Sequence, residues 1–297
     1  MSTYLRGKTG IWQRSRELFQ LYRFHTRNQK EAVGQMITNM REMERRIVEN
    51  LGQPLRDKTI LEVGPGQKQP HLHYFARQNT YTGIDIDLPI LRLGPAAIRH
   101  MWRTNGPLRT LKTVGRRVLG IDSAYKKEMS RQLGSGPRPV TLQQMDAGAM
   151  TMPDNSFDCV FSISVFEHLP EPEKVMREII RVLKPGGVAY IITHLYTSDT
   201  GVHDPAVFGE HEGIPYWAHL QEDRQHMVEA NCYLNKLRLA DYQNLFERLW
   251  PGAQSRNFKN DAKAQTALKQ LRDEGRLAAF TDEELLTDAV ETVWQKP

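Results

Sequence analysis

The stretch that most constrains the fold of this chain is Ile60-Leu61-Glu62-Val63-Gly64-Pro65-Gly66. An apolar run that reaches an acidic residue and then a Gly-Pro-Gly turn is typical of a buried strand ending in a tight loop. Glycine lets such a loop approach a ligand closely. In doubly wound α/β sheets, a nucleotide-like ligand binds at the carboxyl end of the first strand. Because no third glycine follows at 67–69, the stretch alone does not identify the ligand.

A second predicted strand, 81–87, ends in acidic residues. Asp85 lies 19 residues beyond Gly66, and a carboxylate at that distance can accept hydrogen bonds from both hydroxyls of a ribose. Hydrophobic periodicity predicts an alternation of strands and helices along most of the remaining chain. The predicted strands are 140–145, 159–164, 188–193 and 289–294, and the predicted helices are 9–25, 29–51, 70–78, 173–183, 237–250 and 262–275.

Charge is distributed unevenly over the 297 residues, whose formal net charge is +5. Segment 92–138 holds eleven lysine and arginine residues against Asp122 and Glu128, a local net charge of +9. This segment suggests an anionic partner such as phosphate, nucleic acid or a lipid surface, although a solvated basic face explains it equally well. The predicted helix 9–25 is also basic and amphipathic, so it either packs on its own domain or lies on a membrane surface.

The cysteine count and the apolar runs indicate a cellular setting. Cys159 and Cys232 are too few for a disulfide framework or a cysteine-rich metal site. No apolar run approaches the length of a membrane span, and the polar first 30 residues do not resemble a signal peptide. We therefore expect a cytoplasmic protein, with peripheral contact to a membrane as an open alternative.

Several short motifs occur in an order that resembles the class I S-adenosylmethionine-dependent methyltransferases, in particular their small-molecule branch. The resemblance covers about residues 55–195, with a weaker fit over 236–295. The motifs are Glu62–Gly66, Gly83–Asp85, Asp146-Ala147, Pro153–Asp158, Glu167–Leu169 and Arg181–Gly187. The resemblance implies a Rossmann-like, doubly wound α/β fold. Its sheet would have seven mostly parallel strands with one antiparallel edge pair.

The same resemblance implies a division of the chain. Residues 1–54 form an N-terminal helical extension, and 55–297 form the methyltransferase domain. Within that domain we expect a basic, partly helical insertion at 92–139, punctuated by Gly106-Pro107, and an acceptor-side insertion at 194–235. The turn Lys184–Gly187 would end a helix and be structural.

The resemblance also implies that S-adenosyl-L-methionine is the cofactor and assigns its contacts. The Gly64–Gly66 loop after Glu62 would face the amino-acid end, where Lys68 replaces the usual third glycine and either pairs with the carboxylate or points to solvent. Asp85, followed by Ile86, would hold the ribose, and Asp146 with Ala147 would bind adenine. Ser162 and Ile163 would line the sulfonium side.

The catalytic candidates are histidines, because a hydroxyl acceptor needs a base and histidine serves near neutral pH. His194, directly after the fifth strand, is the leading candidate, and His168 and His203 follow. Any one of them could instead cap a turn or lie on the surface. The pairs His203-Asp204 and His211-Glu212 could ligate a divalent metal, but their spacing fits no standard motif, so no metal is expected.

We therefore expect O-methylation of a small molecule, glycan or lipid-linked intermediate. An RNA methyltransferase is the first alternative, since the basic segment also suits nucleic acid. Against it, Ser162-Ile163-Ser164-Val165 stands where amino-group methyltransferases of nucleic acids carry an Asn/Asp-Pro-Pro-aromatic motif. No recognisable RNA-binding module is present either. A non-catalytic cofactor-binding protein is the second alternative. The oligomeric state is not predicted.

Overall fold

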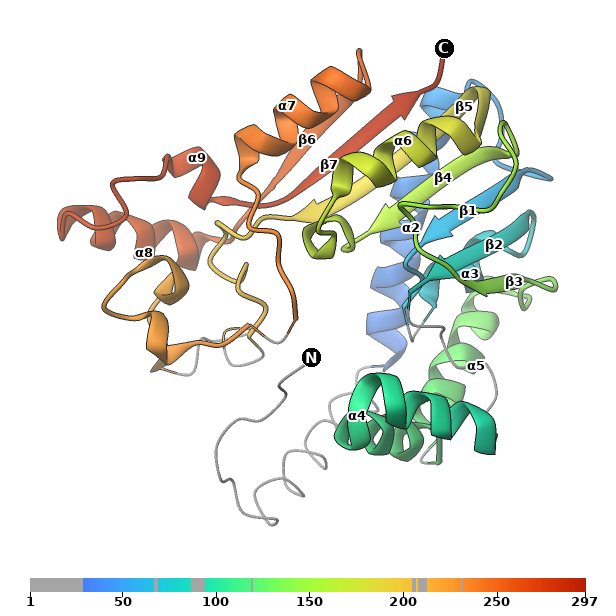
Figure 1. Cartoon of the computed structure of the whole chain (residues 1–297), viewed down its shortest axis with the longest axis horizontal. Coiled ribbons are helices and arrows are strands. Elements are labelled where there is room, and N and C mark those ends of the chain that lie inside the picture. The colour runs from blue at the N-terminus through green and yellow to red at the C-terminus, as the bar shows by residue number, and fades with distance from the viewer. Residues whose placement is uncertain are drawn as a thin grey trace.

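A seven-stranded sheet organises the chain (Figure 1). The computed structural model describes residues 29–66, 69–86, 94–118, 120–204, 207, 213–230 and 232–297. The strands are β1 (Thr59–Val63), β2 (Thr80–Asp85), β3 (Thr141–Gln144), β4 (Phe157–Ile163), β5 (Leu183–His194), β6 (Gln254–Lys259) and β7 (Thr287–Gln295). Their spatial order is β3-β2-β1-β4-β5-β7-β6, and only β7 runs antiparallel to its neighbours. The predicted fold class, including the antiparallel edge pair, is confirmed.

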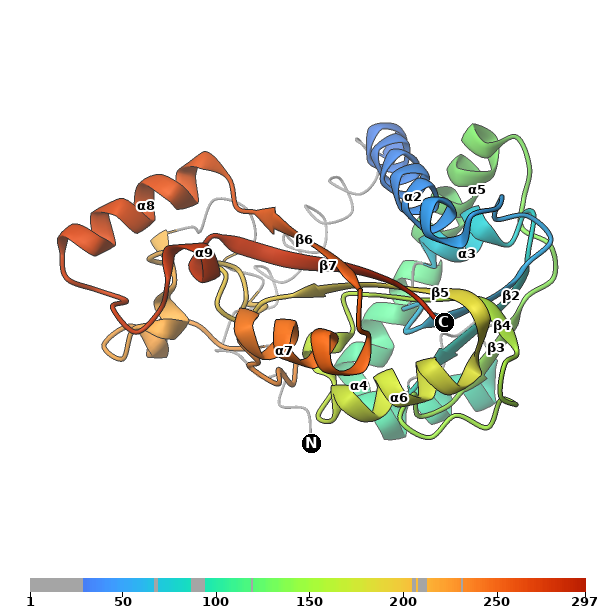
Figure 2. The ribbon, with the colours of Figure 1, turned by 90° about the horizontal axis from the view of Figure 1, so that it is seen from above.

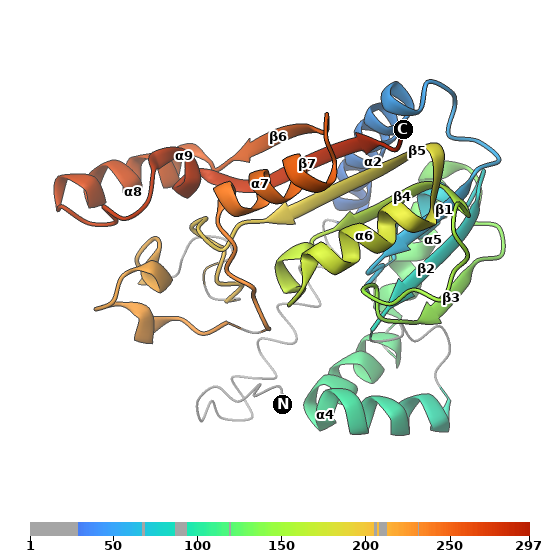
Figure 3. The same cartoon turned by 45° about the horizontal axis from the view of Figure 1, so that its top comes forward.

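Helices cover both faces of this sheet (Figure 2). α2, α3 and α5 lie on one face, and α6 and α7 lie on the other, while α4 stands apart below the sheet (Figure 3). The helices are α2 (Gln29–Leu51), α3 (Pro70–Phe75), α4 (Pro95–Val118), α5 (Ile121–Leu133), α6 (Pro172–Val182), α7 (Leu239–Leu249), α8 (Ala262–Asp273) and α9 (Asp282–Leu285). Three 3₁₀ turns complete the described elements: η1 (Phe166–His168), η3 (Ala218–Leu220) and η4 (Gln225–Met227).

Helix α2 follows the predicted 3.6-residue spacing and buries one apolar stripe. Its stripe packs in one core with β1, β4 and α3, so α2 is part of the layer that covers the sheet. The buried residues are Val33, Ile37, Met40, Met43, Ile47 and Leu51. The methionines therefore fill the core, as expected. The predicted helix 9–25 lies outside the described residues.

The basic insertion contains two helices with different positions. Met129 of α5 is fully buried in the same core as α2 and α3, so α5 is the crossover helix between β2 and β3. Only α4 has the character of a cap. Gly106-Pro107, one of the pairs that punctuate the insertion, lies inside α4. A proline within a helix removes one N–H donor and its ring crowds the carbonyl four residues before it, so this position costs α4 stability.

The turn Lys184–Gly187 differs from expectation in its boundaries. α6 ends at Val182, and β5 begins at Leu183, which pairs with Phe157. The register between β4 and β5 then shifts before Cys159 pairs with Val188, and Gly186 adopts a φ of 74°. The sequence 184–187 is therefore an irregular start of β5 rather than a free turn after the helix.

Asp158 joins three segments at the amino end of the sheet. Its carboxylate accepts hydrogen bonds from the Thr59 backbone N–H (2.8 Å), the Thr59 hydroxyl (2.7 Å) and Lys184 Nζ (3.0 Å). Burial raises the pKa of Asp158, but these donors outweigh it and hold the pKa below the ordinary value of 3.8. The carboxylate therefore stabilises the folded state only while it is ionised.

We expect Asp158→Asn to lower the free energy of unfolding by about 1–3 kcal/mol at pH 7, since it weakens several charge-assisted bonds. The deficit should be complete above the ordinary pKa of aspartate and shrink as the pH falls through the lower pKa of the folded state. Urea denaturation from neutral to acidic pH measures this difference. A deficit that persists unchanged in acid would contradict the assigned ionisation.

Candidate functional site

The carboxyl ends of β1, β2, β3 and β4 meet at one edge of the sheet. Val63 pairs with Ile84 on one side and with Ser162 on the other, and Asp85 pairs with Gln144. The loops that follow these strands therefore lie together. The sheet order places them where doubly wound folds bind nucleotide-like ligands.

The loop after β1 depends on glycine at Gly64. Its φ is 78°, and a Cβ there would lie 2.4 Å from Cγ2 of Val165. The Gly64 N–H donates to the Ile84 carbonyl (2.8 Å), and the Gly66 N–H points at Asp85 Oδ2 (3.4 Å). The loop thus folds toward the end of β2. It leaves a backbone surface without side chains beside the Asp85 carboxylate.

Glu62 lies directly beneath this loop with an exposed fraction of 1%. A hydrogen bond of 2.9 Å joins its Oε1 to Nδ1 of His71, while Oε2 has no hydrogen-bond partner. Burial raises the pKa of Glu62, and His71 only partly opposes the shift. Buried polar atoms in proteins are nearly always hydrogen-bonded, so a buried Glu62 oxygen without a partner is expected where a bound polar ligand supplies the missing donor.

The other predicted cofactor-binding residues differ in burial and in the hydrogen bonds of their side chains. Asp146 lies on the loop after β3 and accepts from the Gly148 N–H (2.8 Å), and Ala147 is buried beside it. Ile86 is 71% exposed at the end of β2. Ser162 is fully buried and donates its hydroxyl to the Val63 carbonyl (3.0 Å), so it ties β4 to β1.

Ile163 and Lys68 are the last two residues of the predicted cofactor site. Ile163 packs against the core beneath α2 and α3. Lys68 lies outside the described residues, so its two open roles stay predictions. The role of Ser162 and Ile163 on the sulfonium side stays a prediction.

The three predicted catalytic histidines come together at the neighbouring edge, beyond β4 and β5. His168 ends η1, His194 ends β5, and His203 follows in the long connection. The ring centroids of His168 and His203 are 5.1 Å apart, and those of His194 and His203 are 6.1 Å apart. A grouping of this kind, at the acceptor-side insertion, is not expected of independent turn-capping histidines.

His194 is paired with Asp288, which precedes the residue opposite it on β7. Nδ1 of His194 lies 3.6 Å from Oδ2 of Asp288, and the Leu195 N–H donates to the Asp288 carbonyl (3.0 Å). Burial lowers the pKa of His194, but Asp288 and the charge of Glu167 outweigh it, so the pKa lies above its ordinary value. The pKa of Asp288 is lowered because its hydrogen bonds and the His194 charge outweigh burial.

Glu167 is the buried acid of this cluster. It is 3% exposed, accepts from the Thr193 hydroxyl (3.2 Å) and has its Oε1 3.9 Å from Nε2 of His168. Burial raises its pKa, with His194 and His168 opposing. His203 shows the opposite direction, because burial and the two neighbouring histidines lower its pKa to about 4. This edge therefore holds Glu167 and His194 with raised pKa values beside His203 with a lowered one. Such clusters of shifted pKa values are common at functional sites.

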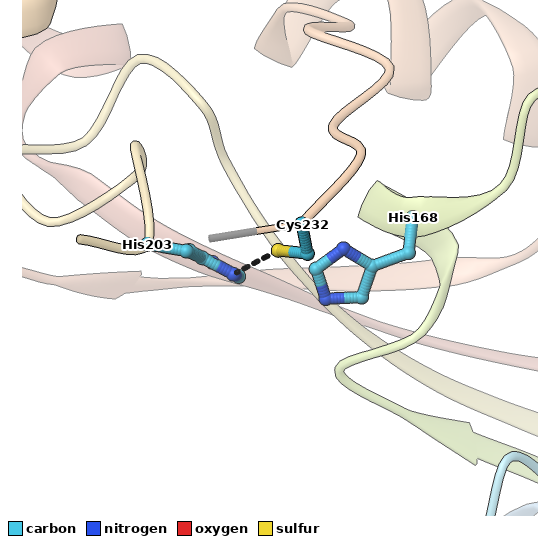
Figure 4. Close-up of side chains that lie close together, drawn as sticks. All are labelled: His168, His203 and Cys232. Atoms are coloured by element: carbon cyan, nitrogen blue, oxygen red, sulfur yellow. Dashed lines mark hydrogen bonds between the residues drawn. The ribbon is translucent and has the colours of Figure 1, made fainter. Parts of the chain in front are cut away.

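Sequence reasoning missed three residues of this cluster: Glu167, Asp288 and Cys232. Glu167 was part of a quoted motif, but its burial next to Thr193 depends on the pairing of β4 and β5. Asp288 becomes a partner of His194 only through the antiparallel register of β7. Cys232 lies close to His203, with Sγ 4.0 Å from Nδ1 (Figure 4). The earlier alternative of a metal bound by His211 and Glu212 falls outside the described residues.

Comparison with known proteins agrees with this architecture. Residues 104–191 match the family model described as a methyltransferase domain. A sterol 24-C-methyltransferase of Aspergillus fumigatus is 29% identical over 180 residues, which are 59% of this chain and 44% of that protein. A phosphatidylethanolamine N-methyltransferase of Cereibacter sphaeroides is 35% identical over 89 residues, 28% of this chain and 43% of that protein.

A solved structure, phosphoethanolamine N-methyltransferase 2 of Haemonchus contortus in complex with S-adenosyl-L-methionine, is 16% identical with a TM-score of 0.47. The match covers 86% of this chain and 52% of that one. Against the curated relatives, the chain spans less than half of their length. The family match begins within α4, so the glycine loop and Asp85 lie outside it.

Residues 104–191 match a methyltransferase domain, and the motifs and the sheet order agree with the resemblance to the class I S-adenosylmethionine-dependent methyltransferases. S-adenosyl-L-methionine is the cofactor of this class, which confirms the predicted cofactor. The residues present fit it: the loop at Gly64 has no room for a Cβ, Asp85 ends β2, and Glu62 keeps a buried acceptor without a partner.

Proposed function

We propose that this chain transfers the methyl group of S-adenosylmethionine to the hydroxyl of a small-molecule or lipid-linked acceptor, with His194 as the general base. The observation that carries the proposal is the His194–Asp288 pair at the end of β5, beside the edge formed by β1, β2 and β4. A base oriented by a carboxylate is the arrangement used to activate oxygen nucleophiles.

The chemistry asks for alignment and one proton transfer. A sulfonium methyl is already activated, so the protein mainly places the acceptor oxygen in line with the methyl group and the sulfur. As the oxygen–methyl bond forms and the methyl–sulfur bond breaks, the hydroxyl proton passes to the imidazole of His194. Asp288 and Glu167 stabilise the imidazolium that results, which is the same interaction that raises the pKa of His194.

Two observations bear on the class of acceptor: the acceptor-side insertion and the names of the matched relatives. The acceptor-side insertion has a small core of its own, in which Trp217 is fully buried against Leu268 of α8. That core anchors the described residues 216–220 of the connection after β5. The matched relatives are named for sterol and phosphatidylethanolamine substrates, which supports a lipid or lipid-linked acceptor for this chain.

Helix α4 supports a location at a lipid surface. Trp102, Leu111 and Val118 are 57%, 69% and 77% exposed, and the basic residues Arg99 and Arg103 are exposed on the same helix. Large apolar side chains among basic ones suit the surface of an anionic membrane. Among the described helices, none is long and apolar enough to cross a membrane. We propose peripheral contact on the cytoplasmic side through α4.

The contact predicts a loss of vesicle binding in the double variant Leu111→Ser/Val118→Ser, whose two side chains lie seven residues apart on one face of α4. Sedimentation with vesicles that contain anionic lipid should show affinity at least about tenfold weaker, since each fully buried large apolar side chain contributes about 1.5–3 kcal/mol. Phe258→Ser, on β6 and 36% exposed, is the matched control and should bind normally. Equal binding by all three proteins would contradict the role of α4.

The cofactor site predicts weaker binding for Asp85→Ala. Calorimetry with S-adenosylmethionine should show a loss of about 1–3 kcal/mol, because the ribose hydroxyls lose an ionised acceptor. Asp273→Ala, at the exposed end of α8, is the control and should leave the affinity unchanged. Unchanged affinity of the Asp85 variant would refute the ribose assignment.

The proposed function is tested by label transfer. Purified protein is incubated with methyl-labelled S-adenosylmethionine and a cell extract, and lipid, nucleic-acid, protein and small-solute fractions are separated. Label in the lipid or small-solute fraction supports the proposal. Label in nucleic acid would overturn it in favour of an RNA methyltransferase. Cofactor binding without transfer to any fraction would favour the non-catalytic alternative.

A further inference from the structure

His168, His203 and Cys232 form a cluster that the proposed methyl transfer does not use. They come from η1, from the connection after β5 and from the segment before α7. One ligating atom of each lies within 4.8 Å of the other two, and Figure 4 shows the three side chains facing one another. We propose that this cluster binds a zinc ion or a cation of similar preference, with the two imidazoles and the Cys232 thiolate as ligands.

The orientation of His168 leaves one ring nitrogen for a metal. Its Nδ1 lies 2.9 Å from the Tyr233 carbonyl, which can only accept, so Nδ1 carries the proton and Nε2 holds the lone pair. Ligating histidines commonly donate their other N–H to a backbone carbonyl, which fixes the tautomer and the ring. The carbonyl comes from the residue after Cys232, so the same backbone contact positions two of the three ligands.

The segment that carries Cys232 is held at both ends. Downstream, the Asn235 N–H donates to the Glu167 carbonyl (2.9 Å), and its side-chain amide donates to the carbonyls of Phe166 (2.8 Å) and Leu169 (3.0 Å). Upstream, the Glu229 N–H donates to the buried carboxylate of Asp204 (2.8 Å). These bonds attach the segment to η1 on one side and to the residue after His203 on the other.

The geometry suits zinc with a small adjustment. Nδ1 of His203 lies 4.0 Å from Sγ of Cys232, against roughly 3.4–3.6 Å between nitrogen and sulfur ligands at tetrahedral zinc bond lengths. Side-chain rotation closes that difference. Two nitrogens and one sulfur favour zinc over magnesium or calcium, which prefer oxygen ligands. Three protein ligands leave a fourth position for water or another group.

The alternative is a hydrogen-bonded group without a metal, in which the Cys232 thiol donates to His203. The two differ in proton count, because zinc binds the thiolate and the thiol proton is released to solvent. Cys232 is exposed, so a cation can reach it. This inference stands apart from the methyl-transfer proposal, since it concerns binding by these three side chains and needs no acceptor.

The test uses full-length protein freed of metal by dialysis against a chelator. Titration with Co²⁺ should give a thiolate-to-cobalt charge-transfer band and the intense visible bands of four-coordinate cobalt, complete at one equivalent. Zn²⁺ should displace the cobalt and raise the thermal unfolding midpoint, and Mg²⁺ should do neither. Cys232→Ser and His203→Ala should weaken binding at least about 100-fold. His226→Ala and Cys159→Ala are the matched controls, since neither residue belongs to the cluster.

Circular dichroism of each variant separates loss of ligation from loss of fold. A charge-transfer band that disappears in folded Cys232→Ser and persists in Cys159→Ala supports the site. Cobalt bound without that band, binding that survives both cluster substitutions, or no binding by the folded wild-type protein would each overturn it.

Discussion

His194→Asn is expected to lower the turnover number by about 10²–10⁴-fold, the usual contribution of a general base. The assay uses labelled S-adenosylmethionine with the extract fraction that accepts label from the wild-type protein. Asparagine is close in size to the imidazole and keeps a polar group beside Asp288, but it cannot take up the acceptor proton. Because His194 lies outside the edge formed by β1, β2 and β3, cofactor affinity should stay unchanged.

Two further variants make the assignment specific. Asp288→Asn should cause a smaller loss, because the imidazole remains and only its orienting carboxylate is removed. His226→Asn, exposed in η4, should retain full activity. If His194→Asn turns over normally while His203→Asn or His168→Asn does not, the base is one of the other two histidines. If none of the three matters, none of these three histidines is the base.

Glu291→Ala should produce the largest loss of stability, about 3–5 kcal/mol, because it removes a fully buried carboxylate and leaves the mostly buried Arg46 without its counter-ion. Glu291 is fully buried on β7 and accepts from Arg46 of α2 (3.0 Å), Arg256 of β6 (2.8 Å) and the Tyr190 hydroxyl of β5 (2.5 Å). Burial and the hydrogen bond to Glu291 raise the pKa of Tyr190, so its hydroxyl stays protonated as a donor.

Urea denaturation measures this loss. Glu49→Ala, on the exposed side of α2, pairs only with a surface arginine in the described structure and should leave the midpoint essentially unchanged. Glu291→Gln keeps the shape and removes the charge, so its loss should lie between the two. A Glu291→Ala protein as stable as Glu49→Ala would show that Arg46 and Arg256 find other partners at little cost.

The architecture was predictable from the sequence because its signals are local and periodic. The stripe from Val33 to Leu51 specified α2, and the run before Gly64 specified β1. The glycine loop and Asp85 were predictable for a related reason. A strand that ends in a glycine turn and a second strand that ends in acid both place their last residues at the carboxyl edge of a parallel sheet.

The sequence did not specify features that depend on neighbours in space. The turn 184–187 was expected to end a helix, yet it lies within β5, which begins at Leu183. The hydroxyl of Ser162 bonds to the Val63 carbonyl of the adjacent strand, and the place of Ser162 on the sulfonium side of the cofactor stays a prediction. No local pattern states which acceptor a buried hydroxyl will find, because the choice is made by the strand that packs beside it.

By itself, the sequence determined six of the seven strands, several of the helices and the edge at which the cofactor motifs gather, since alternation and helical periodicity act over a few residues. Only the tertiary structure decided which residues lie next to the histidines. Asp288 reaches His194 through the antiparallel register of β7, and Cys232 reaches His203 and His168 through a long connection fastened at both ends. Such contacts join residues dozens of positions apart, so they follow from packing of the whole chain and leave no signal in any single stretch of it.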